Sequence, residues 1–261
     1  SITYQHIVQK NHERFEYPKG GIIKMNNENL QTFTSYLLNG DEYNATKMVA
    51  AELAKNTQPK NKTAYLYEEI YTKAMRHVGK LWEEDEISVA HEHIASNLCN
   101  RLLHNKELQL ENKQEDLHEN IIGNLLTEPP KALLFCIEGE EHSLGLKMVE
   151  QIMIEQGWET RYLGANMPTS HALIYANKWR PDVIGISISI VYHLPTLLNF
   201  LNELDHINYN PKIIIGGRMA SFETLKANCP TNVTIIENVY ELLNWMEATT
   251  HLGKQRIKHR A

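Results

Sequence analysis

From residue 131 onward, short apolar runs alternate with segments of helical periodicity, and this alternation constrains the fold more than any other feature of the sequence. We expect strands at about 132–137, 159–163, 183–190, 212–215 and 233–236, and helices at about 143–156, 169–178, 194–205, 221–227 and 239–248. Strands and helices that alternate at this spacing form right-handed βαβ units and a parallel sheet covered on both faces. The sequence therefore predicts a flavodoxin-like (Rossmann-type), five-stranded parallel domain over residues 131–248.

The chain before this domain has a helical pattern, over residues 28–110. We expect one helix at about 29–38, one from the stop at 40–41 to about 54, one capped at 61 or 63 that ends near Trp82, and one capped by Ser88. Four amphipathic helices with short connections are typical of a small bundle, so the fold class is a four-helix bundle cap followed by an α/β domain. Residues 1–27 are interpreted as an N-terminal arm, 111–130 as a linker and 249–261 as a basic C-terminal tail.

Composition excludes several broad classes of protein. The 261 residues carry a formal net charge of −6, which argues against a general binder of nucleic acid or of membrane surfaces. No apolar stretch approaches the roughly 20 residues of a membrane span, and the first residues have no apolar signal region. The three cysteines are scattered through apolar contexts and form no zinc spacing, which favours buried thiols in a reducing compartment. We therefore expect a cytoplasmic globular protein.

A histidine follows the first predicted strand, in the pattern Glu140-x-His142-x-x-Gly145. In open α/β sheets, ligands bind outside the carboxyl ends of the strands, where His142 is expected to lie. A carboxylate that holds one imidazole nitrogen fixes the tautomer and raises the basicity of the other nitrogen, which then suits a metal. Gly145 would let the following helix come close to the ligand. Taken alone, the same residues also fit a solvated turn.

Two further strands carry polar or small residues near the same edge. Ser187 and Ser189 interrupt an aliphatic strand, and Gly216 and Gly217 follow the next strand. Adjacent glycines at a strand end allow the backbone to approach a ligand closely. The alternatives are core hydroxyls that bond within the protein and a tight turn. All three features fall on one side of the predicted sheet, which favours a shared ligand site.

These residues together resemble the cobalamin-binding domain of corrinoid proteins, whose pattern is Asp-x-His-x-x-Gly, then Ser-x-Leu, then Gly-Gly. The resemblance implies that His142 replaces the dimethylbenzimidazole of the cofactor as the lower cobalt ligand. It also implies that the nucleotide tail of the cofactor lies between the serine strand and the glycine pair. This chain departs from the pattern at Glu140, which is expected to lengthen or redirect the contact with His142. It departs again at Ser189, which makes the tail channel more polar.

The helical half carries a second motif, Trp82 followed after nine residues by Glu92 and His93. It resembles the Trp-x9-Glu-His motif of adenosylcobalamin-dependent photoreceptors of the MerR type. The resemblance implies that the bundle covers the upper face of adenosylcobalamin, with the tryptophan over the adenosyl group and the Glu-His pair nearby. In well-known members, a histidine directly after the tryptophan captures cobalt after light breaks the carbon–cobalt bond. Here that residue is Glu83, so the photoproduct would bind water, be captured by another group such as His93 or His91, or lose the cofactor.

Three functions remain open at this point. The first is a cobalamin-binding sensor or regulatory protein, responsive to light through Co–C photolysis, that acts in signalling or transcription regulation through a protein partner or self-association. Residues 1–30 are too few for a DNA-binding module, so no direct DNA contact is expected. The alternatives are a corrinoid carrier protein for methyl transfer and the same fold binding haem or a bilin. In each case we expect a binding protein rather than an enzyme, with no catalytic residues assigned.

Overall fold

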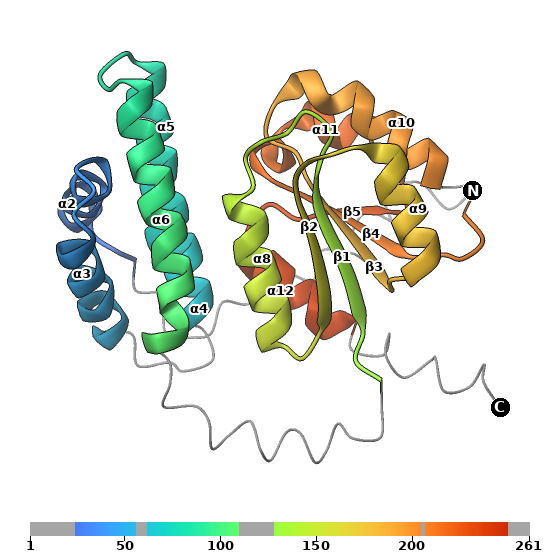
Figure 1. Cartoon of the computed structure of the whole chain (residues 1–261), viewed down its shortest axis with the longest axis horizontal. Helices are drawn as coiled ribbons and strands as arrows, with labels where there is room; N and C mark the ends of the chain where they lie inside the picture. The colour runs from blue at the N-terminus through green and yellow to red at the C-terminus, as the bar shows by residue number, and fades with distance from the viewer. Residues whose placement is uncertain (1–23, 56–61, 110–127, 205–206, 250–261) are drawn as a thin grey trace, which may run out of the picture.

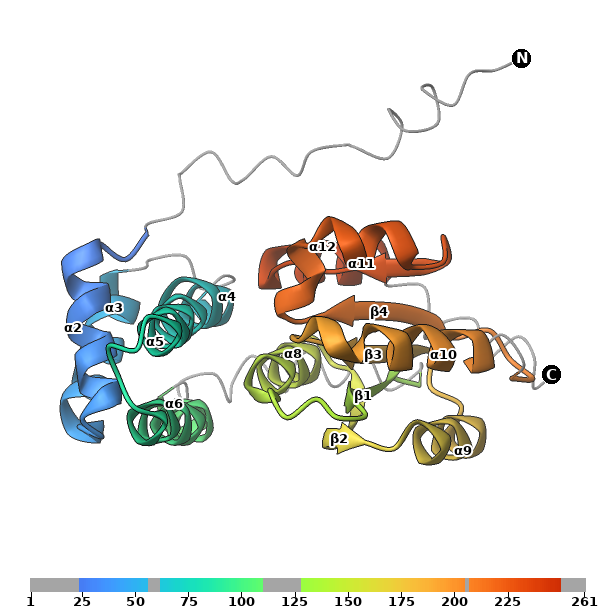
Figure 2. The same ribbon diagram turned by 90° about the horizontal axis from the view of Figure 1, so that it is seen from above.

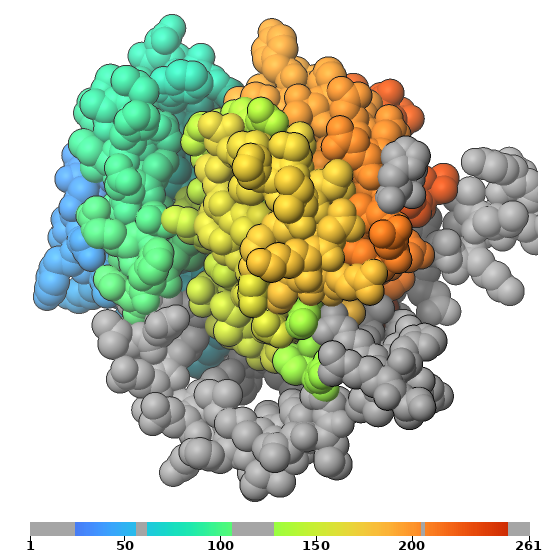
Figure 3. Space-filling view, turned by 45° about the vertical axis from the view of Figure 1, so that its right-hand side comes forward, coloured from blue at the N-terminus to red at the C-terminus, as the bar shows by residue number. Residues whose placement is uncertain are grey.

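The computed structural model describes residues 24–55, 62–109, 128–204 and 207–249. A helical domain lies beside an α/β domain, and the two are packed together along their length (Figures 1 and 3). The predicted N-terminal arm, linker and C-terminal tail lie almost entirely outside the described residues, so their assignment stays a prediction. No helix in the described part of the chain is both long and apolar enough to cross a membrane.

The helical domain contains the predicted four helices, with one irregularity. They are α2 (Asn27–Leu38), α3 (Glu42–Lys55), a continuous helix of α4 (Lys62–Tyr65), η2 (Leu66–Thr72) and α5 (Lys73–Glu83), and α6 (Val89–Gln109). Asn26 caps α2 by accepting from the backbone N–H of Asn29 at 2.7 Å. The irregularity is η2, which is a π-helix and which a 3.6-residue periodicity does not predict.

The α/β domain contains the predicted parallel sheet, in the order β2-β1-β3-β4-β5 of flavodoxin-like folds. The strands are β1 (Lys131–Ile137), β2 (Glu159–Met167), β3 (Val183–Ser187), β4 (Lys212–Gly216) and β5 (Val233–Ile235). Two predicted ends are wrong. β2 continues past residue 163 to Met167, because two register shifts place extra residues of β2 opposite β1. β3 stops at Ser187, so Ser189 lies beyond the strand.

Helices cover both faces of the sheet, as expected for alternating strands and helices (Figure 2). Buried side chains of α9 (Thr169–Trp179), α10 (Leu194–Leu204) and α11 (Glu223–Asn228) form one cluster with one face of the sheet. On the other face, α8 (Leu144–Glu155) and α12 (Val239–Ala248) share a second cluster with the helical domain. The two domains therefore share one apolar core through α8 and α12.

Polar contacts reinforce this junction between the domains. The Lys147 ammonium of α8 donates to the Asn100 side chain of α6 at 2.7 Å. The backbone N–H of Val239, the first residue of α12, donates to the Glu68 carboxylate in the π-helix at 3.2 Å. Burial raises the pKa of Glu68, as expected for a carboxylate enclosed at a domain junction. The contacts add polar links between the domains to the apolar core that they share.

Candidate cofactor site at the carboxyl edge of the sheet

The candidate site begins in the turn between β1 and α8. Glu138 and Gly139 follow β1, and His142 stands two residues before α8. The ends of β3 and β4 lie beside this turn because Cys136 pairs with Ser187 and Ser187 pairs with Gly216. The carboxyl ends of these three strands therefore meet at one edge.

Glu140 is the buried anchor of this turn, with no solvent exposure. Its Oε1 lies 2.5 Å from Nδ1 of His142 and also accepts from the backbone N–H of His142 at 2.9 Å. Its Oε2 accepts from the backbone N–H of Ser189 at 2.6 Å. The longer side chain of glutamate therefore reaches the imidazole directly and also binds the chain just past β3. Ser189 contributes a backbone group here rather than its hydroxyl.

The electrostatics of the pair favour ionised Glu140 beside His142. Burial alone would raise the pKa of Glu140, but hydrogen bonds from His142 and Ser189 outweigh it and hold the pKa below its usual value. The hydrogen bond to Glu140 raises the pKa of His142, and burial and the charge of Arg218 act against that rise. Because the ionised carboxylate only accepts, Nδ1 carries the proton and Nε2 of neutral His142 keeps a lone pair. The His142 side chain is 63% exposed and therefore accessible to a ligand.

Two residues that the sequence analysis missed hold the turn in place. The side-chain oxygen of Asn166 accepts from the N–H of Gly139, and the N–H of Asn166 donates to the carbonyl of Glu140, both at 2.8 Å. Asn166 has a left-handed φ of 49°, and Gly139 has a φ of 89°. A Cβ on Gly139 would lie 2.7 Å from the ring of His193, so that ring packs directly on the turn. An asparagine near the end of a predicted strand is a weak signal for this role.

The serine and glycine residues have different surroundings from those expected. Ser187 is buried, and Gly217 has a φ of 99°. A Cβ on Gly217 would lie 2.3 Å from the carbonyl oxygen of Ile188, so the glycine permits close approach of this chain's own backbone. Gly145 is the opposite case, because a Cβ there would meet no atom within 4 Å. Open space therefore lies beside the first turn of α8.

The residues from the helical domain lie on α5 and α6. Trp82, near the end of α5, is 49% exposed. Glu92 accepts from the hydroxyl of Ser96 at 2.5 Å, and its negative charge raises the pKa of His142, which indicates that the two side chains lie near each other. His93 is 70% exposed, with Nε2 at 3.6 Å from Glu92. Glu83 forms an ion pair with Arg218, which follows Gly217 after β4.

The donor set fits a metal that brings most of its own ligands. Within residues 24–55, 62–109, 128–204 and 207–249, no three histidine, cysteine, aspartate or glutamate side chains are grouped to hold a metal ion. His142 offers one exposed imidazole nitrogen whose orientation is fixed by a buried carboxylate. A macrocycle that supplies the equatorial ligands of its own metal is compatible with a single protein ligand of this kind.

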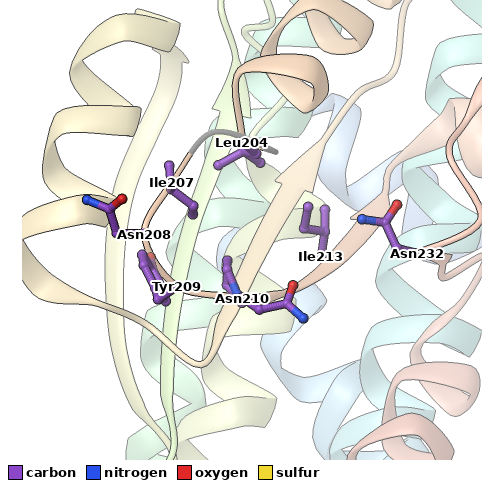
Figure 4. Close-up of a pocket in the computed structure, with 8 residues that line it drawn as sticks. Leu204, Ile207, Asn208, Tyr209, Asn210, Ile213 and Asn232 are labelled. Carbon is purple, nitrogen blue, oxygen red and sulfur yellow. The ribbon is translucent and has the colours of Figure 1, made fainter.

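A cavity of about 380 Å³ lies away from this turn, between the end of α10 and the start of β4 (Figure 4). It is lined by asparagine amides and apolar side chains, among them Asn208, Asn210 and Ile213. The start of β4 is at the amino end of the sheet, whereas His142 is at the carboxyl end. The cavity is therefore separate from the candidate site.

Comparison with known proteins finds a matching family for a stretch within each domain. Residues 130–237 match a family described as B12 binding domain, and residues 30–105 match a second family with the same description. The structure of the monomethylamine corrinoid protein of Methanosarcina barkeri is similar, with a TM-score of 0.66 and 15% identity over 86% of this chain and 100% of that chain. At this identity the likeness concerns the fold.

Two further structures are similar at lower scores. A cobalamin-binding protein from Desulfitobacterium hafniense has a TM-score of 0.44 and 15% identity, over 85% of this chain and 98% of its own. The methanol:cobalamin methyltransferase complex of Methanosarcina barkeri has a TM-score of 0.40 and 14% identity, over 95% of this chain and 89% of its own. Likeness at these scores carries no conclusion about this chain.

Proposed function

We propose that this chain, a B12-binding domain with an N-terminal helical cap, is a corrinoid carrier that holds cobalamin between its two domains and presents it to a methyltransferase. The observation that carries the proposal is the buried Glu140 carboxylate, which holds Nδ1 of exposed His142 and leaves Nε2 to bind cobalt. When bound, cobalamin supplies a cobalt centre that can carry a methyl or an adenosyl group. The chain itself binds and orients the cofactor and is not proposed to be a catalyst.

Other residues of the site are proposed to line the path of the cofactor. Gly145 borders open space at the start of α8, where the nucleotide tail can enter. Ser187 and Gly216 end two neighbouring strands, Ser189 and Gly217 follow those ends, and all four are proposed to flank that tail. On the cap side, Trp82, Glu92 and His93 are proposed to lie over the upper face of the cofactor, where the exposed indole can shield the metal from water.

An exposed apolar rim supports the carrier role. Tyr192 is 86% exposed, Phe222 is 50% exposed and Val191 is 48% exposed. They belong to the segments that follow β3 and β4, at the same edge of the sheet as His142. Large apolar side chains exposed at the edge of the sheet that carries a binding site are typical of surfaces that bind another protein. A partner methyltransferase would need this surface to reach the cofactor.

A light sensor is the second candidate, and the exposed Trp82 beside the site is the observation that favours it. In that case the cofactor is adenosylcobalamin, and light would move the cap and alter self-association or binding to a regulatory partner. Glu83 offers no nitrogen ligand and is engaged by Arg218, which weakens this candidate. The ring of His91 contacts the Ser88 hydroxyl, so exposed His93 is the better placed imidazole.

Absorption spectra test the binding site first. The purified chain is titrated with hydroxocobalamin, and His142→Ala is compared with His171→Ala, which removes another exposed histidine from the far face of the α/β domain. We expect a ligation-dependent spectral shift in the chain and in the control but not in His142→Ala. Equal shifts in all three proteins would refute a role for His142. A Soret band or a bilin spectrum in the protein as isolated would indicate another tetrapyrrole.

A second experiment separates the carrier from the sensor. The chain loaded with adenosylcobalamin is kept in the dark or exposed to green light, and its spectrum and molecular mass are recorded. The chain loaded with methylcobalamin is incubated in the dark with a purified methylcorrinoid:thiol methyltransferase and a thiol. Transfer of the methyl group to the thiol, together with an unchanged mass after illumination, supports the carrier. A change of mass after illumination without methyl transfer supports the sensor.

A further inference from the structure

One ion pair joins the two domains beside the candidate site. Nη1 of Arg218 lies 3.0 Å from Oε1 of Glu83, and the two residues are 135 positions apart in the sequence. Arg218 follows the glycine pair after β4, and Glu83 is the last residue of α5, directly after Trp82. The guanidinium therefore connects the carboxyl edge of the sheet to the tip of the cap.

The surface of α5 accommodates this arginine. A Cβ on Gly79 would lie 2.8 Å from Nη2 of Arg218, so the guanidinium occupies space that any larger residue at position 79 would take. Gly79 lies one helical turn before Glu83, on the same side of α5. Glycine in a helix is less favourable than alanine by roughly 1 kcal/mol, so its presence here calls for a local reason. Contact with the arginine supplies one.

The ion pair also lies near His142. The positive charge of Arg218 lowers the pKa of His142, while Glu92 on the next cap helix raises it. Arg218 on the sheet side and Glu92 on the cap side therefore both lie near the exposed imidazole. A ligand as broad as a corrin ring that reaches Nε2 would also come close to Arg218 and to the cap.

We propose that Glu83 and Arg218 form a clasp that holds the tip of the cap over His142 and must open before the cofactor can enter. The clasp rests on the proposed cofactor site and adds to it the step that controls access. Glu83 and Arg218 act as positioning residues, since they set where α5 and its Trp82 stand relative to the sheet. The side chains of Glu83 and Arg218 are about half exposed, at 57% and 51%. Separation of the ion pair therefore costs little free energy and depends on the salt concentration.

The kinetic test uses hydroxocobalamin and stopped-flow absorbance. For Arg218→Ala, we expect association to be about two- to fivefold faster than in the unmodified chain, as loss of a half-exposed ion pair implies. Gly79→Ala keeps both charges but displaces the guanidinium, and we expect it to accelerate association in the same direction. Its gain in helix propensity protects against loss of folding. High salt should increase the rate at which hydroxocobalamin associates with the unmodified chain but not the rate for Arg218→Ala.

The chain offers a matched control within the helical domain. Arg101 and Glu42 form an ion pair at 2.9 Å, with exposures of 52% and 40%, and both belong to the cap. Arg101→Ala therefore removes an equivalent surface pair without crossing between the domains. We expect its association rate to match that of the unmodified chain. Unchanged or slower association in both Arg218→Ala and Gly79→Ala would overturn the clasp.

A measurement without cofactor separates this inference from the proposed function. Spin labels are attached at Asn97→Cys on α6 and at Asn177→Cys on α9, and Cys229→Ser removes the one partly exposed native cysteine among the described residues. Pulsed electron paramagnetic resonance then reports the distance between the two labels. We expect Arg218→Ala to broaden the distance distribution toward longer values and Arg101→Ala to leave it unchanged. Identical distributions would overturn the clasp even if cobalamin binds. If cobalamin does not bind but the distribution broadens, the proposed function fails and the clasp between the domains stands.

Discussion

Removal of the Glu140 carboxylate is the sharpest test of how the site is organised. In Glu140→Ala, the backbone N–H groups of His142 and Ser189 lose their acceptor, and Nδ1 of His142 loses its partner. A hydrogen bond to a charged group contributes about 1.5–3 kcal/mol. The imidazole of His142 is exposed, so solvent screens its interaction with the carboxylate and reduces what that hydrogen bond contributes to stability. Water can also reach part of the turn in the variant. We therefore expect the two backbone bonds to dominate and the free energy of unfolding to fall by about 2–4 kcal/mol.

The same change should weaken cofactor binding separately from stability. Loss of a carboxylate that orients a histidine ligand costs roughly 10–100-fold in metal affinity, or about 1.4–2.7 kcal/mol. Glu140→Asp is shorter by one bond of about 1.5 Å, so it can reach His142 or Ser189 but not both. We expect its stability and affinity to lie between those of the unmodified chain and Glu140→Ala. Glu141→Gln is the matched control, since Glu141 is an exposed neighbour.

Two assays measure these effects. Urea unfolding of the cofactor-free protein gives the change in stability, with an unchanged slope as the check that the folded state is intact. Titration with hydroxocobalamin gives the affinity, and electron paramagnetic resonance of the reduced cobalt reports whether a nitrogen of His142 is bound. An ordinary surface substitution changes the free energy of unfolding by no more than about 0.5 kcal/mol. If Glu140→Ala changes it by no more than this and binds hydroxocobalamin as tightly as the unmodified chain, the carboxylate does not organise the site.

Three further predictions concern the same edge. Because the pKa of His142 is raised above 6.5 and only neutral imidazole binds a metal, cobalamin affinity should fall as the pH drops through that raised pKa. In Glu140→Gln the pH at which cobalamin affinity is half lost should be lower than in the unmodified chain, because His142 loses its charged partner. The same midpoint in both proteins would contradict this. Gly217→Ala forces a side chain onto Ile188 at a left-handed φ, so it should lower the free energy of unfolding by at least the roughly 1–3 kcal/mol of backbone strain, measured as a lower melting temperature. Asn166→Gly keeps the backbone conformation but loses the acceptor for Gly139, so it should weaken cobalamin binding more than Asn166→Asp. Equal binding by the two variants would show that the Asn166 side chain does not hold the turn in place.

The sequence was sufficient to predict the fold class, a helical domain followed by a five-stranded parallel sheet domain. Alternating apolar runs predict a parallel sheet because such strands are buried on both faces, and β1 and β3 are buried almost throughout. The pairing of Glu140 with His142 was also predictable, since residues two apart around a turn can contact each other. The end of β3 was not, because the run continues to Ile190 while the ladder stops at Ser187.

The rest of the site depends on groups that leave no local pattern. The second anchor of Glu140 is a backbone N–H, that of Ser189, and every residue except proline has one. Asn166 on β2 and Arg218 in the turn after β4 reach the site from distant parts of the sequence, and a single sequence does not relate positions so far apart. The cobalt ligand, the tail channel and the roles of Trp82 and His93 stay predictions that the experiments above address.

The π-helix between α4 and α5 sets the rotational phase of the cap. A π-helical turn closes its hydrogen bonds over five residues rather than four, so it acts as an α-helix with a residue inserted. If all seven residues of Leu66–Thr72 adopted regular α-helical winding instead, α5 would be rotated by roughly 100° relative to α4. Glu83 and Trp82 would then turn away from Arg218, although every side chain would remain in the sequence. Deletion of one residue together with loss of the π turn would leave their direction nearly unchanged, so the π turn itself determines which residues of the last cap turn face the sheet.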